Sequence, residues 1–240
     1  TIGNYLKRIR STFEYAIKKE WLEQNPIQFD SKKYKMKKSS KTEQLQKQFC
    51  TAENLALLLN VDKHFEWDML LTIVRWSGCR IGEALILRWE DIDFNPADPT
   101  ITFRGKDTEH NRDRSEMPTR VTPLWPEQHA TLQKAFEVKD ENDVFVINSI
   151  LNLRDKPEFE LTKENGEVIR SGRYETNAYQ GLRQICKSKG LVVWPKLLHA
   201  IRDFRINEVA NMIGITVPAM DEWFGNTEDV RKKHYSSTKD

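Results

Sequence analysis

The residues best suited to chemistry lie in one stretch near the end of the chain, residues 197–235. His199 and Arg202 are three positions apart in a segment with helical spacing, so both side chains can face one site. A helical segment punctuated by glycines follows, and the basic run 231–233 then leads to Tyr235. A histidine, an arginine and a tyrosine without a cluster of carboxylates suit an anionic substrate and a phenolic nucleophile. The stretch therefore predicts an anion site with Tyr235 as its reactive group.

Two further cationic residues could complete such a site. Gly78 interrupts one predicted helix and a new helix begins near Arg80, which places this arginine at a helix N-terminus. Helix N-termini favour anions, and a guanidinium adds a planar, two-pronged donor. Lys106 follows the predicted strand 98–104 and lies near the tip of a hairpin. Taken singly, either residue is more often an ordinary surface residue, so that alternative stays open here.

The composition narrows the class of protein. With 240 residues, the chain can hold one large or two modest domains, and 31% of its residues are charged. Its mean hydropathy is −0.68, and no apolar run approaches the roughly 20 residues of a membrane span. The three cysteines (Cys50, Cys79 and Cys186) are widely spaced without a C-x-x-C pair, which predicts reduced thiols of a cytoplasmic protein. The sequence contains no GxxxxGK[ST], GxGxxG or HExxH motif, which argues against a nucleotide-driven or zinc-dependent enzyme.

The net charge of +2 hides an uneven distribution of basic residues. Two basic clusters indicate a polyanionic partner, although a lysine run alone is also typical of a solvated linker. The residues concerned are Lys32, Lys33, Lys35, Lys37, Lys38 and Lys41 in the first cluster and Arg231, Lys232 and Lys233 in the second.

Periodicity and turn residues predict an α+β fold, mostly helical with one small antiparallel sheet. Thr51 is expected to cap the helix that carries Leu55, Leu58 and Leu59, and Asn165–Gly166 is a strong two-residue turn signal. Other helices are expected at 4–22, 66–76, from Arg80, 126–136 and 174–189, and strands at 98–104, 121–124, 143–148 and within 158–170.

The first helix sets the expected domain organisation. Its apolar stripe cannot be buried by one helix alone, so its partners are expected upstream, and the start at Thr1 suggests an excised fragment. Asn25–Pro26 is expected to end it. The expected parts are the last helix of a truncated domain at 1–30, a lysine-rich linker at 31–48 and a catalytic domain at 49–240.

Residues 49–240 resemble the tyrosine recombinases, the phage-integrase family. The segment GCRIGEALILRWEDI resembles the first family box, which carries the first arginine. HAIR resembles the family's His-x-x-Arg, and the pair Phe224–Gly225 and then Tyr235 follow at suitable distances. The opening helix is similar to the last helix of the family's core-binding domain.

The resemblance implies a site-specific recombinase or integrase of a mobile element, acting on double-stranded DNA. Tyr235 would form a 3′-phosphotyrosyl link and release a 5′-hydroxyl, without ATP, metal or other cofactor. The implied roles are phosphate clamps for Arg80 and Arg202, general acid for Lys106, phosphate or proton contact for His199, and orientation of the site for Glu83.

Two positions depart from the family pattern. Asn226 stands where the family commonly has His or Trp, and it could bind a phosphate oxygen or cap the helix that follows. Asp203 follows Arg202 where a basic or hydroxyl residue is usual, and it is expected to pair with an arginine such as Arg205.

Several alternatives and partners remain open from the sequence. A type IB topoisomerase uses the same tyrosine and arginines but rejoins the same strand. A catalytically weak DNA-binding relative is the other alternative, because residues 207–226 have the rhythm of a helix-turn-helix. The family works as a tetramer on two DNA sites, with accessory DNA-bending proteins in some members. The short segment after Tyr235 favours a monomer for this chain alone. The resemblance implies a bacterial or phage protein in the cytoplasm, associated with the nucleoid and not with a membrane.

Overall fold

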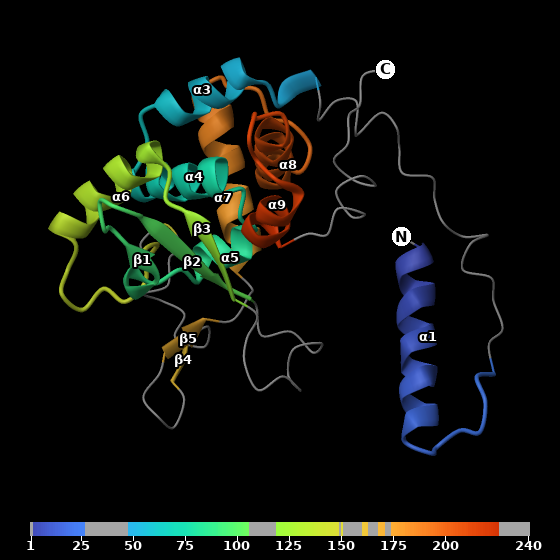
Figure 1. Ribbon diagram of the computed structural model, residues 1–240. Helices are drawn as coiled ribbons and strands as arrows, with labels where there is room; N and C mark the ends of the chain where they lie inside the picture. Colours follow the sequence, from blue (N-terminus) through green and yellow to red (C-terminus); the bar gives the residue numbers. More distant parts are fainter. Residues whose placement is uncertain are drawn as a thin grey trace. The chain divides into compact units, whose positions relative to one another are not determined.

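The computed structural model describes residues 2–26, 48–105, 119–148, 150, 160–162, 168–170 and 174–225 (Figure 1). The chain divides into two units, Thr1–Leu45 and Gln46–Asp240. Residues 27–47 lie outside the described residues, so the division into parts at 1–30, 31–48 and 49–240 stays a prediction.

The first unit contains helix α1 (Ile2–Lys18). The expected end at Asn25–Pro26 is wrong, because the helix stops several residues earlier. Glu20 adopts φ 59°, and the amides of Glu20 and Trp21 donate to the carbonyls of Ile17 and Ala16. This left-handed residue with its two backward hydrogen bonds forms a Schellman motif, which ends a helix without a proline.

The second unit is organised around helix α4 (Phe65–Ser77), which contacts α3, α5, α6 and α8. Its residues Leu70, Ile73 and Val74 are completely buried. Each such side chain stabilises the fold by about 1.5–3 kcal/mol when removed from water. Helix α4 is therefore the element against which the surrounding helices are fixed.

The helices around α4 follow the sequence signals. Thr51 caps α3 (Ala52–Asn60), since its Oγ accepts a hydrogen bond from the Asn54 amide at 3.3 Å. The remaining helices are α5 (Ile81–Leu85), the 3₁₀ turn η1 (Trp89–Asp91), α6 (Pro126–Val138), α7 (Tyr174–Ser188), α8 (Leu197–Ala210) and α9 (Val217–Phe224). The helix-turn-helix rhythm corresponds to the end of α8 and to α9, which pack through Ile206, Val209, Met220 and Phe224.

Three antiparallel strands form the main sheet in the order β1–β2–β3. They are β1 (Ile92–Asp93), β2 (Thr100–Arg104) and β3 (Thr119–Pro123). Phe103 lies opposite Arg120 in the ladder, so the two side chains share one face of the sheet. A separate hairpin pairs β4 (Glu160–Thr162) with β5 (Val168–Arg170), as the turn signal predicted, although Asn165–Gly166 lies outside the described residues.

The strand expected at 143–148 does not form. One bridge joins Phe145 to Arg88, and no longer ladder follows, because the chain after Arg88 turns into η1. Phe145, Val146 and Ile147 are consecutive and all buried. The segment is therefore a buried apolar loop and not a strand with one buried and one exposed face.

The fold class is confirmed as α+β, mostly helical with a small antiparallel sheet (Figure 1). All three cysteines are buried and carry free thiols. Among the described helices, none combines the length and the apolar character needed to span a membrane.

Candidate functional site

The site begins at the C-terminal end of α4, where Gly78 reverses the chain. Gly78 caps α4 in the left-handed region with φ 58°. A Cβ on this residue would lie 2.6 Å from Cε1 of Phe224, so the position requires glycine for space as well as for conformation. The Ser77 hydroxyl supports the turn by donating to the carbonyl of Ile73 at 2.6 Å and accepting from the Cys79 amide.

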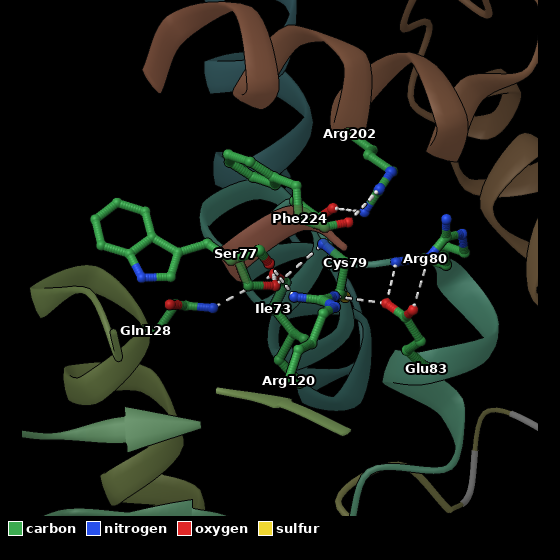
Figure 2. Close-up of polar contacts among 11 residues, drawn as sticks. Ile73, Ser77, Cys79, Arg80, Glu83, Arg120, Gln128, Arg202 and Phe224 are labelled. Atoms are coloured by element: carbon green, nitrogen blue, oxygen red, sulfur yellow. Dashed lines mark hydrogen bonds and ion pairs between the residues drawn. The ribbon is translucent and has the colours of Figure 1, made fainter. Parts of the chain in front are cut away.

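The turn delivers Arg80 to the N-cap position of α5, as predicted. Its amide donates to Oε2 of Glu83 at 2.8 Å, and its Nη1 lies 3.0 Å from Oε1 of the same carboxylate. The Arg80 side chain is 49% exposed whereas that of Glu83 is 8% exposed. The buried Glu83 carboxylate therefore orients Arg80 through an ion pair, while about half of the Arg80 side chain is exposed to solvent (Figure 2).

A residue that sequence reasoning missed, Arg120 on β3, binds the other side of this carboxylate. Arg120 Nη2 lies 2.6 Å from Oε2 of Glu83, and the guanidinium stacks 4.5 Å from the ring centroid of Phe103. Burial alone would raise the pKa of Glu83, but the charge and hydrogen bond of Arg120, assisted by Arg80, bring that pKa below its ordinary value. Glu83 is thus a buried anion held between two arginines.

The pattern around Arg120 gave little indication of this role. Its position in a strand with alternating exposure indicates an inward-facing side chain, but the identity of its partners depends on the tertiary fold.

Arg202 on α8 is buried, with 3% of its surface exposed. Its guanidinium donates to the carbonyls of Gly78 and Phe224, the latter at 2.8 Å (Figure 2). The structure therefore brings Arg202 to the turn that precedes Arg80, which is consistent with the expectation that both arginines belong to one site. His199, one turn earlier on α8, is exposed. The two residues expected on one face of the helix therefore differ in burial, with His199 at the surface and Arg202 in the interior.

The end of α9 is held by arginines from two other elements. Arg120 donates to the carbonyl of Trp223, and Arg202 donates to that of Phe224. The last carbonyls of a helix have no partner within it and carry partial negative charge, so cations bind there favourably. Gly225 then caps the helix in the left-handed region with φ 58°. This geometry fixes the chain immediately before Asn226.

A second ionic group stabilises α8 against α4. Arg75 forms a two-pronged pair with Glu208 at 2.8 and 2.9 Å, and Arg205 binds the same carboxylate and the Trp76 carbonyl. The Arg205 guanidinium also lies 4.2 Å from the ring centroid of Trp125. Arg205 thus pairs with Glu208, which follows one turn later on the same helix, and the expected pairing of Asp203 with an arginine stays a prediction.

The remaining predicted site residues lie outside the described residues, so their roles stay predictions. They are Lys106, Asn226, Tyr235, the linker lysines at 32, 33, 35, 37, 38 and 41, and the basic residues at 231–233. Within the described ranges, no group of three His, Cys, Asp or Glu side chains could hold a metal ion.

The fold is that of the catalytic domain of the tyrosine recombinases, as comparison with solved structures shows. XerA recombinase is 15% identical with a TM-score of 0.57, over 80% of this chain and 61% of that one. The Tn1549 transposon integrase, in complex with circular intermediate DNA, is 17% identical with a TM-score of 0.55, over 98% of this chain and 74% of that one. The chain thus spans less than two thirds of the XerA structure.

The resemblance inferred from the two motif boxes is therefore confirmed for the fold. No protein-family model matches the sequence, and no curated protein matches it either. Because the sequence identities are this low, activity and partners have to be argued from the site itself.

Proposed function

We propose that this protein is a site-specific DNA recombinase or integrase that cuts and rejoins double-stranded DNA through a covalent 3′-phosphotyrosyl intermediate on Tyr235. One observation carries the proposal: Arg202 binds the carbonyl of Gly78, two residues before Arg80. Two segments more than a hundred residues apart in the sequence therefore meet at the turn before Arg80, which supports a shared cationic site.

The proposed roles follow from the positions of the two arginines. Arg80 is half-exposed and backed by the Glu83 carboxylate, so it can present its outer N–H groups to a phosphate without losing its orientation. Arg202 is the second clamp and binds the phosphate from its buried position on α8. The exposed His199 contacts the phosphate from the same helix. Preorganised cations of this kind stabilise the additional negative charge of a pentacoordinate phosphorane.

In the proposed cleavage step, the phenolic oxygen of Tyr235 attacks the phosphorus and passes its proton to the imidazole of His199. The new bond joins the phenolic oxygen to phosphorus, and the bond from phosphorus to the 5′-oxygen breaks. Lys106 gives the leaving 5′-oxygen a proton, which yields a 5′-hydroxyl. A 5′-hydroxyl of a second strand then reverses the step on the phosphotyrosine, so no ATP is consumed.

Ionising the tyrosine is the main energetic obstacle. A phenol has a pKa of about 10, so a Tyr235 phenolate costs about 4 kcal/mol at pH 7. Arg80, Arg202, Lys106 and His199 together supply the positive charge that can offset this cost.

The proposed assembly is a tetramer on two DNA sites in the bacterial cytoplasm. The lysine-rich segment 31–48 and the basic run 231–233 are proposed to bind the DNA backbone.

A second candidate, a DNA-binding relative with weak catalysis, is favoured by the burial of Arg202. Two of its five N–H donors are engaged by backbone carbonyls and only 3% of the residue is exposed, so little of the guanidinium is accessible to a phosphate. This candidate predicts salt-sensitive DNA binding without a covalent product.

The decisive experiment uses DNA selected from a random-sequence duplex library by repeated binding. The selected duplexes are then nicked in turn at each position, so that cleavage near a nick releases a short fragment and traps the adduct. We expect a covalent protein–DNA complex with wild-type protein and none with Tyr235→Phe, at equal DNA affinity. Tyr179→Phe serves as the control tyrosine, since its hydroxyl is already engaged as the acceptor of the Leu197 amide on α8. Binding without an adduct at any nick would refute catalysis and leave the second candidate.

A further inference from the structure

We infer that Arg120 is a positioning residue for the reaction, linking the phosphate-binding Arg80 to the helix that leads to Tyr235. This inference rests on the proposed function and assigns a role to a residue outside the two motif boxes. Arg120 occupies β3, and its side chain is only 10% exposed.

The first half of the link runs to Arg80. Glu83 Oε2 accepts from Arg120 Nη2 at 2.6 Å and from the Arg80 amide at 2.8 Å, while Oε1 lies 3.0 Å from Arg80 Nη1. A carboxylate bound on both sides has little freedom to rotate, so the Arg80 guanidinium is held in one orientation. Figure 2 shows Arg120 reaching Glu83 from the opposite side to Arg80.

The second half of the link runs to α9. Arg120 Nη1 donates to the carbonyl of Trp223, and a Cβ on Gly225 would lie 3.3 Å from Arg120 Cδ. Arg120 therefore binds the last turn of α9 through its guanidinium, and its aliphatic stem leaves little room for a side chain at the C-cap Gly225. Gly225 precedes Tyr235 by ten residues, so α9 sets the point from which the proposed nucleophile is delivered.

Stacking explains why an arginine is needed at this position. The guanidinium lies 4.5 Å from the centroid of Phe103, its cross-strand neighbour, which fixes its plane. A planar group with several N–H donors can then reach Glu83 and the Trp223 carbonyl together. A lysine can reach one of them at a time, so it cannot keep both halves of the link.

The chain offers a matched control in Arg88. Its side chain is 14% exposed, pairs with Glu90 at 3.2 Å and lies 5.7 Å from the ring centroid of Phe145. Arg88→Met thus removes a partly buried arginine that pairs with Glu90 and stacks on Phe145, neither of which belongs to α9 or to the Arg80–Glu83 pair. Loss of general stability affects both variants, whereas loss of positioning affects only Arg120→Met.

The test has two measurements on the whole chain. Hydrogen exchange of the Phe224 and Gly225 amides should be about tenfold or more faster in Arg120→Met than in wild type or Arg88→Met. Single-turnover adduct formation at saturating DNA, well below the melting temperature, should fall about 10- to 100-fold in Arg120→Met, with DNA affinity nearly unchanged. Arg120→Lys should restore only part of the rate.

The outcomes separate this inference from the proposed function. Unchanged exchange at the end of α9 in Arg120→Met overturns the link whatever the DNA result. Equal adduct rates in Arg120→Met and Arg88→Met also overturn it, provided that wild type forms the adduct. If wild type forms no adduct while α9 loosens only in Arg120→Met, the link holds and the proposed function fails.

Discussion

Replacing Gly78 by alanine should destabilise the protein because two separate costs meet at one residue. Gly78 has φ 58°, and a left-handed conformation costs an L-residue about 1–2 kcal/mol. The new Cβ would lie 2.6 Å from Cε1 of Phe224, and crowding of this kind in a packed core costs about 1–3 kcal/mol. The expected loss in free energy of unfolding is therefore about 2–5 kcal/mol.

The glycine at the end of α7 separates these two costs. Gly190 has φ 67°, and a Cβ there would meet nothing within 4 Å. Gly190→Ala should therefore show the conformational cost alone. Urea unfolding followed by tryptophan fluorescence gives both free energies, and the difference between the two variants measures the contact with Phe224.

The contact itself can be relieved from the other side. Phe224→Leu removes the ring atom that the new Cβ would meet, so in the Gly78→Ala background it should cost less than it does alone. If Gly78→Ala and Gly190→Ala destabilise the protein equally, the close approach of Phe224 is not a constraint and the reasoning is refuted.

Two further predictions concern titration. The pKa values of Glu83 and Glu208 are lowered in the folded protein against the opposing effect of burial, by Arg120 and Arg80 for the first and by Arg75 and Arg205 for the second. Their stabilisation is full above the ordinary carboxyl pKa of about 4.5 and is lost as the pH falls through the lower folded values. The urea midpoint should therefore drop as the pH is lowered below about 4.5. Glu83→Gln should flatten this drop, and a midpoint with the wild-type slope would contradict the assignment. Burial raises the pKa of the Cys79 thiol to about 12, so alkylation at pH 8 should be slow in the folded protein and fast in urea. Rapid labelling of Cys79 in the native state, measured by mass spectrometry of its peptide, would be inconsistent with this burial.

Local signals predicted the parts of the fold that depend on neighbours in sequence. Thr51 caps its helix through its own hydroxyl, and Gly78 ends α4 in the conformation that glycine favours. Arg80 takes the N-cap position that the break at Gly78 indicates. These features need only a few adjacent residues, so sequence reasoning could place them.

Sequence reasoning failed where the answer depends on distant residues. Arg120 finds its partners Glu83 and Trp223 at separations of 37 and 103 residues, which no local pattern reveals. The spacing of His199 and Arg202 does not reveal that the first side chain is exposed and the second buried, because this depends on how deep α8 lies in the fold. The apolar run around Phe145 predicts a strand, but a continuous apolar segment does not distinguish a paired strand from a buried loop.

The arginine contacts at the ends of α4 and α9 also bear on how the protein folds. The bond from Arg202 to Gly78 closes a loop of 124 residues, and that from Arg120 to Trp223 closes one of 103 residues. Loops of this length carry a large entropic cost that is recovered only when many native contacts form together. A chain emerging from the ribosome would therefore hold α4, Arg80 and the sheet long before α9 arrives. The cationic site would be completed at the last stage of folding, so partly made chains would not present it to DNA.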